Sequence, residues 1–177
     1  MPRLAPAEPP YDPLVAEPID RVRPPGAPPL ALFRTLAHNP RVLSRVFAGN
    51  LLDKGAVSIR QRELMILRTC ARAGSEYEWG VHVAAYAGAA GLDEAAVAAT
   101  CAPDPGAMDA DDRLVLDLAD ALFERADVDD ALWARLTAAW APDVIIELIA
   151  LAGLYRMVSS FTNALGIENE PFGARFA

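Results

Sequence analysis

Apolar residues along most of this chain recur at three- and four-residue intervals, the spacing of one face of a helix. Leucine, alanine and arginine dominate these stretches, which are separated by breaks rich in Gly, Pro or Asp, and alternating β-branched residues are nearly absent. The pattern predicts an all-α protein, a helical bundle whose short loops favour antiparallel packing. The expected helices are near 28–37, 40–53, 59–73, 75–91, 93–100, 110–126, 128–140 and 143–165.

Two neighbouring helices have clear end signals. Ser58 and Gln61 have the spacing of a capping box, and Gly74 stands where a left-handed residue usually ends a helix. Ser75 and Glu78 form a second possible capping box for the next helix. That next helix contains small residues, which let another backbone approach closely, at Gly80, Ala84, Ala85, Ala87 and Gly88.

The N-terminal segment differs from the rest. Residues 1–28 hold nine of the 15 prolines, and proline removes a backbone donor and restricts the residue before it. We therefore expect a proline-rich extended arm over 1–28, lying on its own domain or on a neighbouring subunit. Residues 29–177 form the single helical domain that follows.

Composition narrows the function classes. With 177 residues, 53% of them hydrophobic, the chain can bury one sizeable core. Its net charge of −8 argues against nucleic acid or an anionic membrane surface as a partner. Cys70 and Cys101 lie 31 positions apart without metal-spaced ligands, so neither a disulfide framework nor a metal site is expected.

Compartment signals favour the cytoplasm. The start MPRLAPAEPP lacks the apolar core of a signal peptide, and two free cysteines suit a reducing environment. The longest apolar stretch, 144–158, is broken by Glu147 and Arg156, so no membrane span is expected.

Three polar residues form the candidate catalytic group. Glu63 lies on one helix, and Glu78 and His82 lie on the next, across the tight corner at Gly74. Glu78 and His82 are four residues apart, so their side chains occupy one helix face. A carboxylate raises the pKa of a nearby imidazole and burial lowers it, which is the tuning that acid–base catalysis near neutral pH requires.

Other residues extend this face. Tyr86 continues the row of His82, and Cys70 lies two turns beyond Glu63, so both are candidates to line the same pocket. Arg60 can neutralise Glu63 or receive a substrate carboxylate. Structural roles stay open beside these: Glu78–His82 as a solvated helix pair, Cys70 and Tyr86 as core residues.

The segment RQRELMILRTCARAGSEYEWGVHVAAYAGAAGLDEAAVAA resembles the carboxymuconolactone decarboxylase and alkyl hydroperoxidase D (AhpD) superfamily. The family signature is a glutamate, eleven residues, Cys-x-x-Cys, three residues and a histidine. In this chain Glu63 and His82 keep their places, while Ser75 and Glu78 occupy the two cysteine positions. The stretches HNPRVL and LYRMVSSFTNALG also resemble the family.

The resemblance implies an AhpD-like bundle around a central helical hairpin, assembled as a homo-oligomer (dimer, trimer or hexamer). Disulfide-cycling peroxidase activity is argued against, because Ser75 and Glu78 can form neither a sulfenate nor a disulfide. The decarboxylase branch needs no cofactor, since the substrate's conjugated carbonyl accepts the electrons released with carbon dioxide. By resemblance His82 is the general acid or base, Glu78 its partner and Glu63 the orienting group, and Ser75 hydrogen-bonds substrate or caps its helix.

We therefore expect a cofactor-independent, decarboxylase-like lyase or isomerase for a small carboxylate- or lactone-bearing metabolite. The alternatives are an alkyl hydroperoxidase-like redox protein that uses Cys70, and a non-catalytic oligomeric family member.

Overall fold

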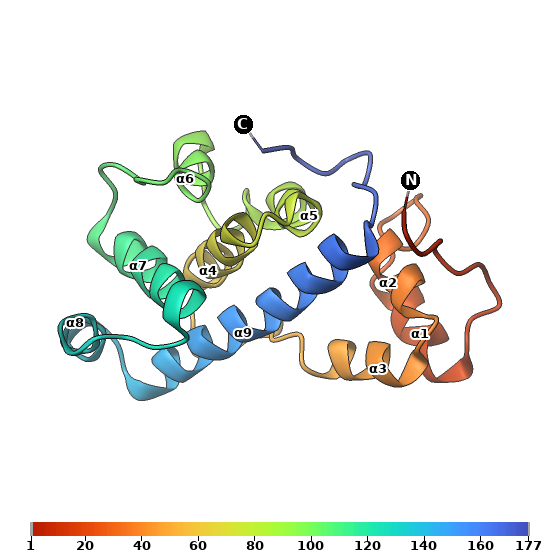
Figure 1. The fold of residues 1–177 in the computed structure, drawn as a ribbon, viewed down its shortest axis with the longest axis horizontal. Helices are drawn as coiled ribbons and strands as arrows, with labels where there is room; N and C mark the ends of the chain where they lie inside the picture. Colours follow the sequence, from red (N-terminus) through yellow and green to blue (C-terminus); the bar gives the residue numbers. More distant parts are fainter. Residues whose placement is uncertain (1, 177) are drawn as a thin grey trace.

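The computed structural model describes residues 2–176, in which all regular secondary structure is helical (Figure 1). The all-α expectation is therefore confirmed. The helices are α1 (Pro13–Arg21), α2 (Ala31–Leu36), α3 (Pro40–Ala48), α4 (Ile59–Arg72), α5 (Glu76–Tyr86), α6 (Glu94–Ala99), α7 (Ala110–Arg125), α8 (Asp130–Ala139) and α9 (Pro142–Leu165).

Helix α4 is the centre of the larger part of the fold. It packs against α5, α7 and α9, and every residue from Arg62 to Cys70 is buried. A helix enclosed on several sides cannot show a simple two-faced pattern, because almost every side chain meets a neighbouring helix. The main hydrophobic core forms here, among α4, α5, α7, α8 and α9.

The α4–α5 hairpin starts and turns largely as predicted. Ser58 and Gln61 form the capping box, with the Gln61 amide 3.2 Å from the Ser58 hydroxyl and the Ser58 amide 3.0 Å from Oε1 of Gln61. Gly74 has φ of 65°, the left-handed conformation that glycine adopts without strain. The second capping box is wrong. Ser75 makes no side-chain cap, because it is buried against α9 and its Oγ lies 2.7 Å from Oγ1 of Thr162.

Two helices end earlier than expected. Helix α3 stops at Ala48, followed by Gly49 and Asn50, and α5 stops at Tyr86 rather than near Gly91. The glycines of the 87–91 stretch disfavour a continued helix, and Gly91 takes a φ of 65°. The chain turns there before α6.

The N-terminal segment is not extended throughout, which corrects the expectation for 1–28. Residues Pro13–Arg21 form α1, because Asp12 caps the Leu14 amide at 2.9 Å and Pro13 occupies the first turn, where a missing amide proton costs nothing. Buried Val15 and Ile19 join a second hydrophobic cluster, built from α1–α3 with residues of α5 and α9. The segment packs on its own chain, at the opposite end from α8 (Figure 1).

The C-terminal tail explains one of the small residues in α5. The Ala174 amide donates to the Gly80 carbonyl at 3.1 Å, and a Cβ on Gly80 would lie 2.2 Å from the Ala174 carbonyl oxygen. The prediction of close backbone approach is therefore confirmed at Gly80. The tail continues over α5, where Phe176 packs on Trp79 with ring centroids 5.2 Å apart.

Helix α9 runs through the middle of the molecule, from near α8 toward α1–α3 (Figure 1). By length and composition alone it is long and apolar enough to span a membrane, a possibility that the sequence reading did not foresee. In the fold, one side of α9 is core, with Leu148, Leu151 and Tyr155 buried in contact with the main cluster. Its other side carries the exposed Ile146 and Met157.

A buried arginine ties α4 to α7. Arg68 is 1% exposed, and its guanidinium is bidentate to Asp120, with both N–O distances 2.7 Å. It also donates to the carbonyls of Thr100 and Ala102 at 3.1 and 2.6 Å. One guanidinium thus satisfies acceptors on α7 and on the segment that follows α6.

Replacing Arg68 with alanine is expected to lower the free energy of unfolding by about 3–5 kcal/mol, because acceptors arranged around a buried cation lose it. Arg72, which also pairs with Asp120 but is partly exposed, is the matched control. Arg72→Ala is expected to cost about 1 kcal/mol or less. Urea unfolding of the variants measures both, and equal losses would contradict this assignment.

Candidate functional site

The α4–α5 hairpin brings the three predicted residues into contact. Nδ1 of His82 lies 2.7 Å from Oε2 of Glu63, and Nε2 of His82 lies 3.4 Å from Oε1 of Glu78. All three side chains are buried, Glu63 completely. The imidazole therefore sits between two carboxyl groups, one from each helix of the hairpin.

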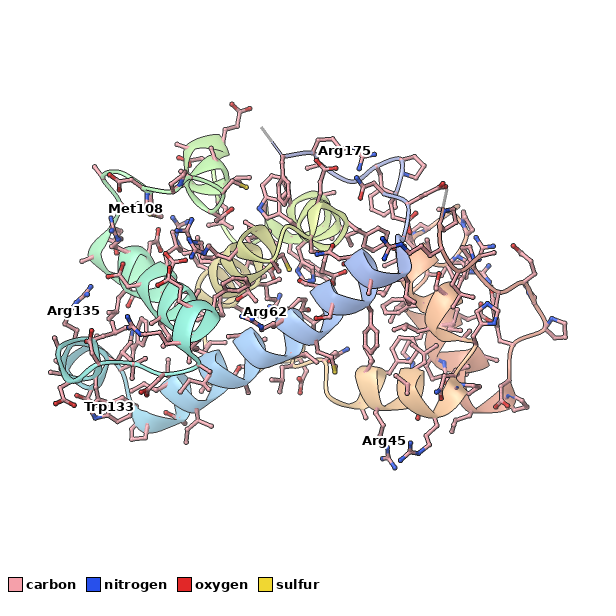
Figure 2. All side chains as sticks on the ribbon, viewed as in Figure 1. Arg45, Arg62, Met108, Trp133, Arg135 and Arg175 are labelled. Atoms are coloured by element: carbon pink, nitrogen blue, oxygen red, sulfur yellow. The ribbon has the colours of Figure 1, made fainter. Side chains whose placement is uncertain are left out.

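Glu63, His82 and Glu78 form a buried row of contacting side chains. Arg62 extends this row beyond Glu63, and sequence reasoning missed it. Its Nε donates to Oε1 of Glu63 at 2.8 Å, and Nη1 donates to the Leu52 carbonyl at 2.9 Å. Figure 2 shows Arg62 among the central helices, whereas Arg45 and Arg135 project outward. The sequence offered little signal, because a neighbour of Glu63 in a helix normally points to a different face.

The row alternates in charge, which explains how it can be buried. Burial alone would lower the pKa of His82, but the hydrogen bonds to Glu63 and Glu78 outweigh it and raise the pKa to about 9. The imidazolium can then donate through both nitrogens. Arg62, Glu63, His82 and Glu78 form a chain of cation, anion, cation and anion.

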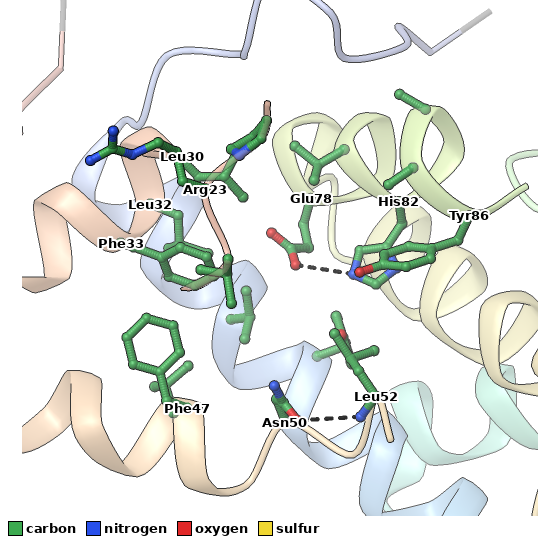
Figure 3. A pocket seen from close by; sticks show the side chains of 18 of the residues that line it. Arg23, Leu30, Leu32, Phe33, Phe47, Asn50, Leu52, Glu78, His82 and Tyr86 are labelled. Atoms are coloured by element: carbon green, nitrogen blue, oxygen red, sulfur yellow. Dashed lines mark hydrogen bonds and ion pairs between the residues drawn. The ribbon is translucent and has the colours of Figure 1, made fainter. Parts of the chain in front are cut away.

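A cavity of about 490 Å³ begins where this row ends. Figure 3 shows Glu78, His82 and Tyr86 on one side of it, with Phe33 and Phe47 across from them. Glu78 is the only acidic residue among the described residues that line it. Most of the wall is apolar. It comes from α2, α3, α5 and α9, at Leu32, Phe33, Val46, Phe47, Val81, Leu154 and Val158, and from the adjoining loops and the C-terminal tail, at Leu30, Leu52 and Phe172.

Not all predicted residues reach this cavity. Glu78, His82 and Tyr86 line it, whereas Glu63 lies behind His82 and contacts the cavity only through it. Ser75 is buried at the α9 interface, bonded to Thr162 as described above. Fewer of the predicted residues therefore line the cavity than the sequence pattern implied.

Of the two roles left open for Arg60, the neutralisation of Glu63 is wrong. Its Nε and Nη2 lie 2.9 and 2.6 Å from Asp112 oxygens on α7, and Nη1 donates to the Gly91 carbonyl at 2.5 Å. Arg60 does not line the cavity. Arg60 instead ties the start of α4 to α7.

Cys70 also lies outside the cavity lining. It is fully buried, and its sulfur accepts from the Ser159 hydroxyl at 3.7 Å. Burial, with a further contribution from Glu78, raises the pKa of the Cys70 thiol well above its ordinary value. A protonated, enclosed thiol is a poor nucleophile, which favours the core role for Cys70.

Tyr155 of α9 is a cavity residue that sequence reasoning missed. Its ring meets the His82 ring edge-on, with centroids 5.0 Å apart and an interplanar angle of 90°. The long apolar helix gave no reason to separate this tyrosine from the core residues around it. Its position opposite α5 in the folded chain is what distinguishes Tyr155 from those core residues.

No cluster of three or more metal-binding side chains occurs within residues 2–176. His82 has the carboxyl groups of Glu63 and Glu78 as its neighbours. The arrangement suits proton transfer between a buried relay and a molecule held in the cavity.

Two solved structures share this architecture. One is an uncharacterized peroxidase-related protein from Silicibacter sp. TM1040, with a TM-score of 0.79 at 17% identity over 96% of this chain and 92% of that one. The fold is AhpD-like. The other, titled an alkylhydroperoxidase AhpD core and an uncharacterized peroxidase-related protein from Ralstonia eutropha JMP134, has a TM-score of 0.67 at 18% identity, over 93% and 95% of the two chains. No family model and no curated protein matches the sequence.

These likenesses confirm the resemblance at the level of the fold. They cover 96% and 93% of this chain, so most of the N-terminal helical region belongs to the shared architecture. The chemistry of the site has to be argued from the residues of this chain.

The stability of the protein is expected to depend on pH through His82. Its pKa is about 9 in the fold against an ordinary 6.5, so the folded state holds more protons between these values. The stabilisation is complete below about pH 6.5 and is lost as pH rises through about 9. Its size is on the order of 3 kcal/mol. Urea unfolding across this range should show the decline in the wild type and not in His82→Gln, and parallel pH profiles would contradict it.

Proposed function

We propose that this AhpD-like protein is a cofactor-independent acid–base enzyme, a decarboxylase-like lyase or an isomerase. Its substrate is a small metabolite that bears a carboxylate or a lactone. The observation that carries the proposal is the buried row of Arg62, Glu63, His82 and Glu78, which ends at an apolar cavity of about 490 Å³. That volume lies in the range of small-molecule sites.

Glu78 and His82 are the groups that would contact substrate. Glu78, as the only acid in the described wall, removes or returns a proton at a substrate carbon. His82 supplies or accepts a proton through Nε2, which faces Glu78. Glu63 holds the other ring nitrogen and Arg62 holds Glu63, so the imidazole is fixed in one orientation.

The apolar wall supports the choice of reaction. A carboxylate that enters such a cavity loses water, which favours its departure as neutral carbon dioxide while the negative charge spreads over the enolate that remains. Arg21 and Arg23 also line the cavity and are its two arginines within the described residues, so they can meet an entering carboxylate. Arg21 already pairs with Glu17, and Arg23 with Asp20. Both ion pairs are exposed and therefore weak, so a substrate carboxylate can replace either acid.

The redox alternative receives less support. The two solved neighbours are called peroxidase-related, but the two positions of the cysteine pair hold Ser75 and Glu78 in this chain. Cys70 is enclosed, and the other cysteine, Cys101, is neither within its helix nor bonded to it. Peroxide reduction would need a thiolate that meets the oxidant and a second thiol that resolves it.

The test is a panel of small lactones, β-keto acids and conjugated carboxylates, assayed for carbon dioxide release and for exchange of carbon-bound hydrogen with deuterium oxide. His82→Gln and Glu78→Gln are each expected to reduce turnover about 100-fold or more while the helical circular dichroism is kept. Glu94→Gln, an exposed acid on α6, is the control and should retain full rates. Retained turnover in His82→Gln would sink the proposal, and so would a loss confined to Cys70→Ser.

We also propose that the protein is a homo-oligomer that associates through the outward face of α9. Ile146, Ile149 and Met157 lie on this face with 67%, 40% and 41% exposure, and the open side of Gly153 lies between them. Their spacing of three, four and four residues gives one continuous stripe. Exposed apolar stripes of this kind are typical of interfaces between subunits.

Ile149→Arg is expected to lower the molar mass measured by size-exclusion chromatography with light scattering, because a charge in the stripe opposes its burial. Leu14→Arg, on exposed α1 at the other end of the molecule, should leave the mass unchanged. A monomeric wild type would refute this association, and so would an Ile149→Arg variant of unaltered mass.

A further inference from the structure

The hydroxyl of Tyr155 is an unused hydrogen-bond donor at the cavity. The side chain is 3% exposed, yet its hydroxyl makes no hydrogen bond with any residue of 2–176. Over the same residues, every completely enclosed side-chain nitrogen or oxygen has a partner. The Tyr155 hydroxyl must therefore retain accessible surface, and the space that this residue lines is the cavity.

Two features make this hydroxyl suitable for binding a ligand. Its ring is held edge-on by His82 within the packing of α9, so the donor has a fixed position. Burial, and then the nearby Glu78, raise the pKa of Tyr155 well above its ordinary value. The group is thus a neutral phenol at physiological pH and keeps the proton that it donates.

We propose that Tyr155 donates a hydrogen bond to a carbonyl oxygen of the substrate, and that this site takes carbonyl compounds with an apolar body in which a bond to the carbon next to the carbonyl is broken. This inference rests on the proposed function and names its substrate class. Glu78, His82 and Tyr155 all line one cavity, from two different helices, so a single small molecule can meet all three.

The electrons balance without an oxidant or a reductant. In isomerisation, the C–H bond beside the carbonyl breaks, its proton passes to the Glu78 carboxylate, and the electron pair moves through the new C=C bond onto the carbonyl oxygen. In decarboxylation, the C–C bond breaks, carbon dioxide leaves, and the same oxygen receives the pair. In both cases the oxyanion forms where Tyr155 donates. In isomerisation Glu78 then gives its proton to another carbon, and in decarboxylation the His82 imidazolium supplies the proton that the carbon takes up.

This arrangement separates the two charges of the reaction. As Glu78 becomes neutral on taking a proton, the negative charge moves to the oxygen that Tyr155 holds. A donor placed in advance needs no reorganisation at that moment, which is why such groups stabilise transition states strongly in apolar sites. Tyr155 would thus be a catalytic residue through direct contact with the substrate oxygen.

The probe for this role is para-nitrophenol, whose planar, delocalised oxyanion resembles an enolate and whose ionised form has its own absorption band. The wild type is expected to bind it, and Tyr155→Phe to bind it about ten- to a hundredfold more weakly, the equivalent of one hydrogen bond to a charged acceptor. Titration followed by absorbance and by calorimetry measures the affinity and the ionised fraction.

Tyr77→Phe is the matched control, since Tyr77 is another buried tyrosine but its hydroxyl donates to Glu170 at 2.7 Å and accepts from the Leu32 amide at 3.0 Å. Tyr77→Phe should lower the thermal midpoint and leave the affinity for para-nitrophenol unchanged. Tyr155→Phe should do the reverse, because its hydroxyl has no partner within the described fold.

Three results would overturn the inference: no binding by the wild type, equal affinities of the wild type and Tyr155→Phe, or a thermal midpoint of Tyr155→Phe lowered as far as that of Tyr77→Phe. The measurement requires no turnover, so it is independent of the activity test. Loss of turnover in His82→Gln with unchanged probe binding in Tyr155→Phe would refute the role of Tyr155 alone.

Discussion

The hydrogen bond between Glu63 and His82 is the contact on which the site depends. Glu63 is completely buried in the most enclosed helix of the fold, where an uncompensated carboxylate would be very costly. Arg62 from the same helix and His82 from α5 compensate it. The same contact that makes Glu63 tolerable fixes the imidazole ring and raises its pKa. Stability and proton chemistry therefore rest on one interaction.

The cavity exists because the fold has two hydrophobic clusters. The larger one surrounds α4, and the smaller one joins α1–α3 to residues of α5 and α9. The cavity lies at their border, with Glu78, His82 and Tyr155 on α5 and α9 and much of its apolar wall from α2 and α3. Since α2 and α3 supply that wall and α1 contributes Arg21, these helices are part of the site rather than an accessory to the bundle.

The replacement of the cysteine pair changes what this hairpin can do. At the first cysteine position, Ser75 points to Thr162 of α9 and serves packing. At the second, Glu78 faces His82 and the cavity. The hairpin thus keeps the histidine and the glutamate of the resemblance but offers a carboxylate where a thiol would stand. A carboxylate transfers protons and cannot cycle through disulfides, and this difference separates the two proposed chemistries.

Local patterns in the sequence were enough for the helices after residue 28, for the capping box at Ser58, for the turn at Gly74 and for the juxtaposition of Glu63, Glu78 and His82, but not for α1. These depend on neighbours within one hairpin, and short-range spacing fixes them. The same spacing could not show that Arg62 rather than Arg60 pairs with Glu63 or that Ser75 turns to Thr162. Nor could it show that Tyr155 opens onto the cavity. Those choices depend on which distant helix lies opposite each side chain, and only the packing of α7 and α9 against α4 and α5 decides that.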